Sequence, residues 1–467
     1  MTMADSNHAA AFAASDRPHI LMITNHGIHD WDVRSGLRDT GGQNHYVNAL
    51  SQTLVDLGFR VTSMNRGGFP DPVTKEMRRG TRHNGDFQRI VYLEGGGSEF
   101  IRKEDLDKKI LGEEADFAAK LIRDEKLPIE LVISHYWDAA VLANMLREKL
   151  AFKAKHLWIP HSIGAMKKEN FRGQPPEVTG PLKFAERIAF ETEAMKGIDA
   201  VISTSGELSK YLRRDYSREP ELFLPPCIDT DLIRPLPPGA GCERILDFLS
   251  GGDASLRSKL AKSRTVLEVS RTDRTKRKDV VIRAVAKAAK KHPDLMCLLT
   301  ISPDAKEVYA DLCSLMDELG VRDRTVFIGM VPRDIMSELF ALSTVYVTPA
   351  DQETFGMSIQ EAAACRRPII SSDRVPFATE YLMKDEREET VETPSGPSKL
   401  RWGEGGVVAP SGDHEAFGYA LERILSDKSL QESLADGAYR ATIPYFTWPN
   451  LTRELLRKAE VKIPADA

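Results

Sequence analysis

The strongest constraint on the fold is a strand, a loop and a helix that follow one another in the second half of this 467-residue chain. The run VYVTPA, residues 345–350, is apolar and β-branched, as a buried strand requires. Residues 353–373 read ETFGMSIQEAAACRRPIISSD, with apolar positions at helical spacing and then a second apolar strand. This order predicts two parallel strands joined through a helix.

The same alternation runs through both halves of the chain. The strand HILMITNHG, residues 19–27, precedes a glycine pair and a helix that ends at Gly58. Further strands are expected at RVTSMN, RIVYLEG, LVISHYWD, HLWIPH and AVISTS, and later at TVLEVSR, LMCLLTIS, TVFIGM, VYVTPA and PIISS. The pattern predicts an α/β protein with two Rossmann-like, doubly wound domains facing a cleft, where the carboxyl ends of the strands would bind ligands.

Changes in composition predict the domain boundaries. The Pro-rich run PLPPGAGCE, residues 235–243, interrupts the alternation and is interpreted as a linker. The charged stretch at residues 383–402 contains Pro and Gly and predicts a surface insertion rather than a core element. The expected divisions are a disordered tail (1–17), a first Rossmann-like domain (18–234) joined by a C-terminal helix (445–460), and a second Rossmann-like domain (235–444).

Composition excludes several classes of function. The formal net charge of −5 provides no basic surface for nucleic acid or anionic lipid, and no stretch of about eighteen apolar residues exists to span a bilayer. The five cysteines form no C-x-x-C pair, which argues against a zinc site and a disulfide framework. The N-terminus has no signal-peptide pattern. We therefore expect a cytoplasmic protein with a small-molecule substrate.

Two glutamates flank the predicted helix entrance. Glu353 and Glu361 are eight positions apart, and Gly356 lies where unpaired backbone N–H groups and the positive end of the helix dipole can receive a diphosphate. Glu353 could then bind sugar hydroxyls, and Glu361 the paired hydroxyls of a ribose. The alternative is a solvated loop acid and an unrelated acid on the helix face. The flanking strands and glycine favour a nucleotide-sugar site.

This segment resembles the Glu, seven residues, Glu signature of retaining glycosyltransferases with the GT-B architecture. Other segments resemble the sucrose-phosphate synthase and mannosylfructose-phosphate synthase branch of glycosyltransferase group 1. They are DTGGQNHYV (39–47), SHYWDA (134–139), PHSIGAMKK (160–168), ERIAFE (186–191) and SRTDRTK (270–276). The resemblance covers residues 19–456, and the segments follow the family's order.

The resemblance implies the donor contacts. Arg271 and Lys276 would hold the diphosphate, although a basic loop alone is more often a solvated surface. His161 would contact the donor hexose near the reacting centre; a lone histidine is otherwise an ordinary buried group. The implied catalytic residues are His161, Arg271, Lys276 and Glu353. The implied donor-binding residues are Gly42, Arg271, Lys276, Phe355, Gly356, Met357 and Glu361.

The resemblance also implies an acceptor site. Lys167 and Arg187 match positions that hold an acceptor phosphate in relatives, and such cations suit charge-assisted hydrogen bonds. The alternative makes Arg187 a surface ion-pair partner of Glu186 or Glu191. The implied acceptor-binding residues are Gly41, Gln43, Lys103, His135, Lys167 and Arg187.

Two segments depart from the family's pattern. The chain reads SEFIRKE, so Glu99 stands where a lysine is expected and Lys103 at the second lysine. It reads DRVPFA where the family has a Gly-Gly-Pro segment after PIISSD. The first departure concerns the acceptor and the second the donor.

The expected function is transfer of a hexose from a nucleoside-diphosphate sugar, UDP-glucose above all, to a small phosphorylated sugar with retention of configuration. The alternatives are a non-phosphorylated acceptor, as in a sucrose synthase, a nucleotide-sugar epimerase or hydrolase, and a binding protein without turnover. No cofactor or metal is expected, because the Asp-x-Asp at Asp229 and Asp231 reads as a helix cap or hinge. The sequence does not indicate an oligomeric state.

Overall fold

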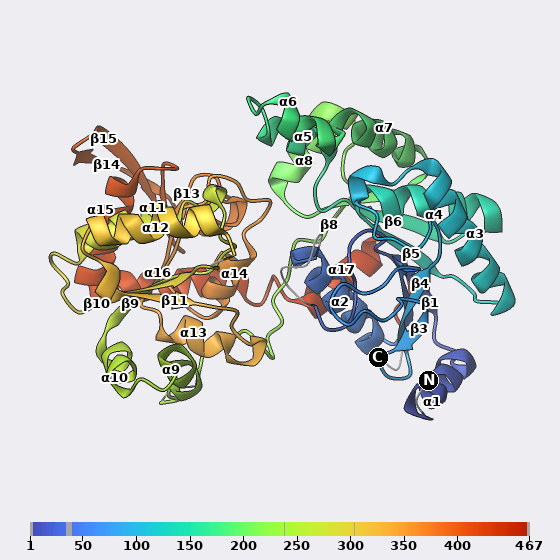
Figure 1. Ribbon diagram of the computed structural model, residues 1–467, viewed down its shortest axis with the longest axis horizontal. Coiled ribbons are helices and arrows are strands. Elements are labelled where there is room, and N and C mark those ends of the chain that lie inside the picture. The colour runs from blue at the N-terminus through green and yellow to red at the C-terminus, as the bar shows by residue number, and fades with distance from the viewer. Residues whose placement is uncertain (1–2, 34–39, 238, 303, 465–467) are drawn as a thin grey trace. The chain divides into compact units, whose positions relative to one another are not determined.

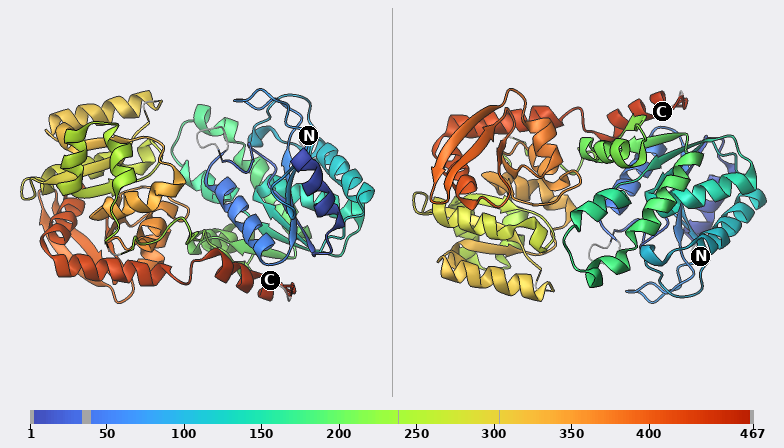
Figure 2. Two further views of the ribbon diagram at one scale, coloured as in Figure 1. Left: turned by 90° about the horizontal axis from the view of Figure 1, so that it is seen from below. Right: turned by 90° about the horizontal axis from the view of Figure 1, so that it is seen from above.

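The structure is a computed structural model that describes residues 3–33, 40–237, 239–302 and 304–464. The chain divides into a first unit, Met1–Cys227 with Trp448–Ala467, and a second unit, Ile228–Thr447. Each unit contains an eight-stranded sheet with helices on both faces (Figures 1 and 2). The predicted α/β class with two Rossmann-like domains is confirmed.

The first unit follows the predicted alternation, because most of its buried parallel strands are short runs rich in apolar residues. Its elements are α1 (Met3–Ala14), β1 (His19–Ile23), α2 (Gly42–Asp56), β2 (Arg60–Arg66), β3 (Gly80–His83), β4 (Gln88–Leu93), α3 (Lys108–Asp124), β5 (Leu131–His135), α4 (Tyr136–Leu150), β6 (Lys155–Ile159), α5 (Gly164–Asn170), α6 (Pro176–Thr179), α7 (Phe184–Ala194), β7 (Ala200–Ser203), α8 (Gly206–Tyr216), β8 (Leu222–Phe223) and α17 (Trp448–Lys458). The strand order is β3-β4-β2-β1-β5-β6-β7-β8, and only the β3–β4 pair is antiparallel. Strands β1, β5 and β6 are therefore neighbours, and their carboxyl ends lie at one edge of the sheet.

The second unit repeats the architecture. Its elements are α9 (Glu243–Ser250), α10 (Ala254–Lys262), β9 (Arg264–Glu268), α11 (Lys278–Ala288), β10 (Leu295–Thr300), α12 (Lys306–Glu318), β11 (Thr325–Ile328), α13 (Met336–Leu342), β12 (Val345–Thr348), α14 (Met357–Ala364), β13 (Ile369–Ser372), β14 (Arg387–Thr393), β15 (Gly396–Trp402), β16 (Val407–Ala409), α15 (His414–Ser426) and α16 (Lys428–Thr442). The strand order is β11-β10-β9-β12-β13-β16-β15-β14. Strands β9 and β12 pair in parallel at the centre, so the loops that follow them are adjacent.

Short turns of other helix types complete the chain. They are η1 (Lys103–Asp105), η2 (Gly180–Leu182), η3 (Met195–Gly197), η4 (Arg274–Lys276), η5 (Arg322–Arg324), η6 (Arg333–Ile335) and the π-helical turn η7 (Ala378–Leu382). Asp229 accepts a hydrogen bond from the backbone N–H of Asp231 and forms a turn near the start of the second unit. The Pro-rich run at 235–243 lies within the second unit, before α9.

The predicted disordered tail is wrong over helix α1. Alanines favour a helix, and Phe12 provides an apolar anchor that is 1% exposed. The Phe12 ring lies 4.3 Å from the Arg89 guanidinium carbon, and Arg60 donates a 2.9 Å hydrogen bond to the Phe12 carbonyl. The tail is held by partners distant in sequence, which its own composition does not reveal.

The predicted surface insertion at residues 383–402 is also wrong in part. Strands β14 and β15 form an antiparallel hairpin that extends the sheet of the second unit. Val391, Leu400 and Trp402 are buried in the core of this unit. Alternating polar and apolar residues place one face of the hairpin against α15 and leave the charged face in solvent.

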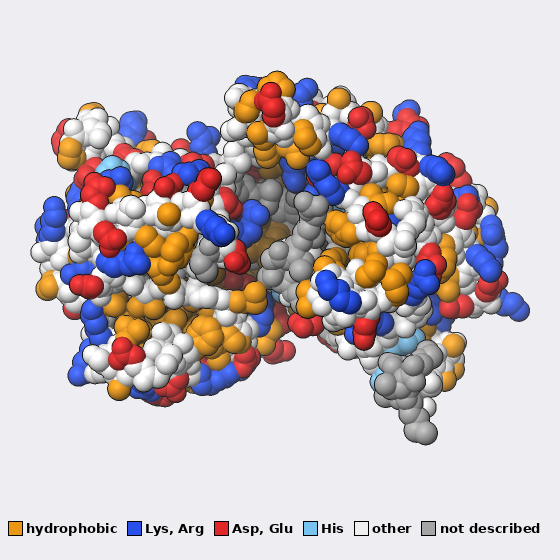
Figure 3. All heavy atoms as spheres, in the orientation of Figure 1, with side chains coloured by type: hydrophobic (Ala, Val, Ile, Leu, Met, Phe, Trp, Pro, Cys, Tyr) orange, Lys and Arg blue, Asp and Glu red, His pale blue; other side chains and the backbone are white. Residues whose placement is uncertain are grey.

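The surface has no strongly charged face in the view of Figure 3, where Lys, Arg, Asp and Glu side chains are interspersed over each unit. Among the residues described, none of the helices has the length and apolar composition to cross a bilayer. Nor do those residues contain a group of three or more His, Cys, Asp or Glu side chains arranged to hold a metal ion.

Candidate functional site

The candidate site of the first unit lies where β1, β5 and β6 end. Tyr136 follows β5 directly and has a φ of +76°, and His161 follows β6 with a φ of +55°. Left-handed backbone costs energy in a residue other than glycine and is frequent at functional sites. Two such residues on neighbouring strand ends mark this edge of the sheet.

His161 is held by aromatic neighbours. Its Nε2 lies 3.0 Å from Nδ1 of His135, and the edge of its ring meets Tyr46 at 4.8 Å between centroids. Burial, with a smaller effect of His26, lowers the pKa of His161 to about 3. The imidazole is therefore neutral at physiological pH and is partly exposed at the strand end, where the sequence predicts the donor hexose.

His135, predicted as an acceptor contact, is fully buried in this structure. Its side chain is 0% exposed, so it has no surface to offer a sugar, and burial holds its pKa well below the usual value. The prediction of His135 as an acceptor contact is therefore not supported. Its Nδ1 lies 3.0 Å from Nε2 of His161.

The predicted glycine pair starts helix α2. Gly41 donates a 2.9 Å hydrogen bond to Oδ1 of Asn44, and an added Cβ at Gly41 would meet no atom of the described residues within 4 Å. Gln43 donates to the Thr24 hydroxyl at 3.3 Å, near the end of β1. Gly41 and Gln43 are thus partly exposed and Gly42 is exposed, while Asp39 of the same motif lies outside the described residues.

Three predicted acceptor cations come together around one cavity of about 140 Å³. Lys103 comes from η1, Lys167 from α5 and Arg187 from α7. Lys167 points its Nζ toward the Tyr136 ring, 5.9 Å from the centroid. Lys103 is 3.1 Å from the carboxylate of Glu104, which also lines the cavity. Segments far apart in sequence therefore form one cationic cavity.

Arg187 pairs with Glu191, as the alternative interpretation has it, but the pair is buried rather than on the surface. It is 7% exposed and donates to Glu191 at 2.7 Å, to the Tyr136 hydroxyl at 2.5 Å and to the Ser162 carbonyl at 2.6 Å. All three guanidinium nitrogens thus donate to the protein. Arg187 is neither a surface ion pair nor a cation without protein partners, because it joins the loops after β5 and β6.

Glu191 completes this buried network. It is 0% exposed and accepts hydrogen bonds from the backbone N–H of Gly164, at 2.9 and 3.1 Å, and from the Tyr216 hydroxyl. A Cβ at Gly164 would lie 2.8 Å from Ile188 and 3.1 Å from a Glu191 oxygen, so a larger residue would displace the network. The spacing of Arg187 and Glu191 by four residues hinted at their pairing, but their burial was not predicted.

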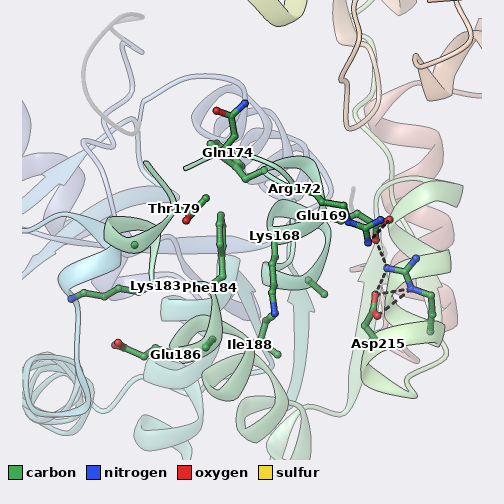
Figure 4. A pocket seen from close by; sticks show the side chains of 15 residues that line it. Lys168, Glu169, Arg172, Gln174, Thr179, Lys183, Phe184, Glu186, Ile188 and Asp215 are labelled. Carbon is green, nitrogen blue, oxygen red and sulfur yellow. Dashed lines mark hydrogen bonds and ion pairs between the residues drawn. The ribbon is translucent and has the colours of Figure 1, made fainter. Parts of the chain in front are cut away.

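A larger cavity of about 940 Å³ adjoins the cationic one (Figure 4). Both are lined by Phe171, Lys183, Phe184 and Glu186. On one side Arg214 bridges the carboxylates of Glu169 and Asp215, at 2.7 and 2.8 Å. The sequence motifs did not predict this cavity, because they supply only part of its lining, and the rest comes from the turns between α5 and α7 and from α8.

Sequence reasoning also missed a buried acid behind the strand ends. Glu114 on α3 accepts a 2.8 Å hydrogen bond from Asn25, and its other oxygen lies 3.4 Å from Arg66. Burial raises the pKa of Glu114 to about 8. His26, one residue after Asn25, is 3.0 Å from Asp138. These contacts fix the loop after β1, and no local sequence signal pairs residues this distant.

The candidate site of the second unit follows β12. Gly356 caps α14 with a φ of +105°, and a Cβ there would lie 2.7 Å from Val375 and 2.8 Å from Ile359. Only glycine fits this turn without displacing its neighbours. Phe355 is 2% exposed and packs against Phe377 at 5.5 Å, so it shapes the loop from behind. Met357 begins the helix whose N-terminus is the predicted diphosphate site.

Lys276 and Glu353 meet in this site. Lys276 Nζ lies 2.5 Å from the carboxylate of Glu353, with side-chain exposures of 8% and 23%. The loop after β9 thereby places the predicted diphosphate cation beside the predicted sugar-binding acid. Arg271 is 84% exposed and has only Asp273, at 3.6 Å, as an ion-pair partner among the described residues. The structure brings Lys276 and Glu353 together but leaves Arg271 apart from them.

Glu361 has a partner that the sequence did not indicate. On α14 its carboxylate is 2.9 Å from Arg333 of η6, and the two side chains are 12% and 46% exposed. η6 follows β11, the edge strand of the sheet. The pair leaves Glu361 partly exposed one turn into the helix, at the position where the sequence predicts a ribose contact.

Comparison with known proteins identifies the class. Residues 256–441, most of the second unit, match the sequence model of "Glycosyl transferases group 1". The structure is similar to that of a sucrose-phosphate synthase from Thermosynechococcus elongatus, with a TM-score of 0.71, 22% identity and coverage of 94% of this chain and 98% of that one. The second unit therefore carries a glycosyl transferases group 1 domain, and the chain has the predicted GT-B fold.

Particular relatives cover nearly the whole chain. A mannosylfructose-phosphate synthase of Agrobacterium fabrum is 26% identical over 95% of this chain and 91% of its own length. A probable sucrose-phosphate synthase of Thermosipho melanesiensis is 25% identical over 91% and 93%. A D-inositol 3-phosphate glycosyltransferase of Acidothermus cellulolyticus is 23% identical over 90% and 86%. The predicted resemblance to this branch is confirmed.

Proposed function

We propose that the protein is a retaining hexosyltransferase that moves a hexose from a nucleoside-diphosphate sugar, UDP-glucose above all, to a small phosphorylated sugar. The observation that carries the proposal is the cavity where Lys103, Lys167 and Arg187 converge. Lysine and arginine recognise phosphate through charge-assisted hydrogen bonds. The relatives named as sucrose-phosphate and mannosylfructose-phosphate synthases support the same substrate class.

The residues of the second unit would hold the donor. Glu361 would accept the ribose hydroxyls, and the N-terminus of α14 at Gly356 would face the diphosphate. Lys276 would stabilise the charge that grows on the departing diphosphate, and Glu353 would bind hexose hydroxyls beside it. Arg271, exposed in this structure, would turn onto the diphosphate when the donor binds.

The residues of the first unit would hold the acceptor and orient the hexose. Lys103 and Lys167 would bind the acceptor phosphate, Arg187 would brace their cavity, and His161 would contact the hexose. In the proposed reaction, the anomeric carbon loses its bond to the diphosphate oxygen and gains one to the acceptor oxygen on the same face. The acceptor's proton passes to the departing phosphate. No protein base, metal or other cofactor forms part of this proposal.

A neutral acceptor is the second candidate, and one observation favours it. Glu104 and Glu186 line the same cavity as the cations, and Arg187 already donates to protein atoms. These features reduce the positive charge available to a phosphate. Initial rates with a free sugar and with its phosphate, at equal concentrations, distinguish the two acceptors. A preference for the phosphate supports the proposal, and equal rates contradict it.

Lys167→Ala is expected to raise the acceptor KM for a sugar phosphate by about tenfold to a hundredfold, because one charge-assisted contact worth about 1.5–3 kcal/mol is lost. The KM for the free sugar and for the donor should stay near the wild-type values. Steady-state kinetics measures all three. The neighbouring exposed Lys168 lines the larger cavity, so Lys168→Ala is the matched control. Equal effects of the two substitutions would remove Lys167 from the phosphate site.

Glu361→Ala is expected to weaken binding of the nucleoside diphosphate by about 1.5–3 kcal/mol, since hydrogen bonds to a charged acceptor are lost. Titration calorimetry with UDP measures the change, and circular dichroism checks the fold. Arg333→Met is the control, because it removes the ion-pair partner and keeps the carboxylate. Unchanged UDP affinity in Glu361→Ala would show that this carboxylate does not hold the ribose.

A further inference from the structure

The candidate hexose site contains the partly exposed imidazole of His161. Two further histidines considered with it, His29 and His135, are buried. His29 and His135 are both 0% exposed, whereas His161 is partly exposed at the end of β6. Burial lowers the pKa of His29 to about 3, lowers that of His135 well below the usual value, and lowers that of His161 to about 3. All three rings are therefore neutral at physiological pH, and each carries a single N–H hydrogen.

The contact between His135 and His161 restricts both tautomers. Nδ1 of His135 and Nε2 of His161 are 3.0 Å apart, and the rings are nearly parallel at 19°. Two neutral imidazoles share one hydrogen across such a contact, so the tautomer of one determines that of the other. Nδ1 of His161 has no hydrogen-bond partner within the described parts of the chain, which leaves it for a ligand.

The surroundings hold this pair rigidly. Tyr46 meets the His161 ring edge-on and donates a 2.8 Å hydrogen bond to the Leu224 carbonyl. Trp448 of α17 also packs against Tyr46, at 4.8 Å between centroids. The His161 ring is therefore in contact with two buried aromatic rings, those of His135 and Tyr46.

Asn44, which follows the glycine pair, determines the tautomer of His29. Oδ1 of Asn44 accepts from the Gly41 N–H, so Nδ2 of Asn44 is the donor toward the Ile28 carbonyl at 3.2 Å and Nδ1 of His29 at 3.1 Å. Neutral His29 therefore carries its hydrogen on Nε2. The buried Nε2 atoms of His29 and His135 have no partner among the described residues. Asn44 thus connects His29 to the loop that begins α2.

We propose that His135 is a positioning residue for His161: it sets the ring orientation and tautomer of His161 and makes no contact with substrate. This inference rests on the proposed hexose transfer, in which Nδ1 of His161 meets the hexose. His135 acts by presenting Nδ1 to Nε2 of His161, so that the hydrogen-bonding character of the free nitrogen of His161 depends on the tautomer of His135. Nδ1 of His161 is then already oriented for its hydrogen bond when the donor hexose binds.

The kinetic test compares His135→Leu with His135→Asn. Leucine removes the polar partner, and we expect kcat to fall about tenfold while the acceptor KM stays near the wild-type value. Asparagine keeps a polar atom near the Nδ1 position, and we expect it to restore most of the loss. His156→Leu is the matched control, since His156 is also buried and neutral but bonds Ser134 and Asn144 instead. An equal loss of kcat in His156→Leu, or no rescue by asparagine, overturns the proposal.

The spectroscopic test is independent of turnover. Nitrogen-15 histidine labelling of the full chain reports tautomers through two-bond proton–nitrogen correlations, with His161 assigned by its loss in His161→Gln. We expect one dominant tautomer of His161 in the wild type and in His156→Leu, and a mixed population in His135→Leu. An unchanged His161 spectrum in His135→Leu overturns the proposal. A wild-type protein without transferase activity would refute the proposed function, whereas these spectra would still report on the His135–His161 contact.

Discussion

Replacement of Arg187 by methionine is expected to lower the free energy of unfolding by about 3–5 kcal/mol, because it leaves the carboxylate of Glu191 buried without its cation. Glu191 is 0% exposed, and its remaining hydrogen bonds come from Gly164 and Tyr216. Methionine keeps the length and apolar stem of arginine, so the loss reports the charge and its hydrogen bonds. Urea denaturation followed by circular dichroism, with amide exchange of α7, measures it.

Arg213→Met provides the matched control for this effect. Arg213 pairs with Glu219 at 2.6 Å, but the side chains are 52% and 66% exposed, so water screens the pair and its loss should cost less than about 1 kcal/mol. The double variant Arg187→Met/Glu191→Gln should recover part of the stability, since no unpaired buried charge remains. A loss in Arg187→Met no larger than in Arg213→Met would refute the buried network.

Replacement of Lys276 by methionine is expected to lower kcat by about 10²–10³, the usual effect of removing a group that stabilises charge in the transition state. Its ammonium would meet the departing diphosphate, whose charge grows as the glycosidic bond breaks. Because the interaction strengthens during the reaction, kcat should fall more than the donor KM rises. Single-turnover kinetics with UDP-glucose measures the chemical step directly.

Arg274→Met is the control for Lys276→Met. Arg274 lies in the same turn, is 67% exposed and pairs with Asp311 at 2.8 Å, so its replacement should change kcat by less than about twofold. Glu353→Gln tests the other half of the ion pair and should raise the donor KM. If Lys276→Met kept kcat within about threefold of the wild type, the leaving-group role would belong to another cation.

The alternation of strands and helices was predictable because buried parallel strands are short apolar runs. Strands β1, β5 and β6 and the β12–α14–β13 unit lie where the pattern placed them. The pattern missed α1 and the β14–β15 hairpin, where short segments are held by distant partners. Helix α1 needs Arg60 and Arg89 around Phe12, and the sequence does not show which chain segments will meet there.

The sequence motifs predicted which residues line the candidate site but not which partners those residues have. The family motifs selected Lys103, Lys167 and Arg187, and the structure places them around one cavity. They did not reveal that Arg187 forms a buried ion pair with Glu191 or that Glu361 forms an ion pair with Arg333. The packing of the surrounding segments determines such pairings, and a motif reports residue types at a spacing without the neighbours that bury them.

The most direct test of the proposed transfer is a product analysis with isotope-labelled donor. The protein is incubated with UDP-glucose uniformly labelled with carbon-13 and with pairs of hexoses and their phosphates, and products are analysed by mass spectrometry and NMR. The proposal predicts a phosphorylated disaccharide that carries the labelled glucose with its α configuration retained, formed in equal amount with UDP. Release of free labelled glucose with every acceptor, or equal yields from hexoses and their phosphates, would contradict it.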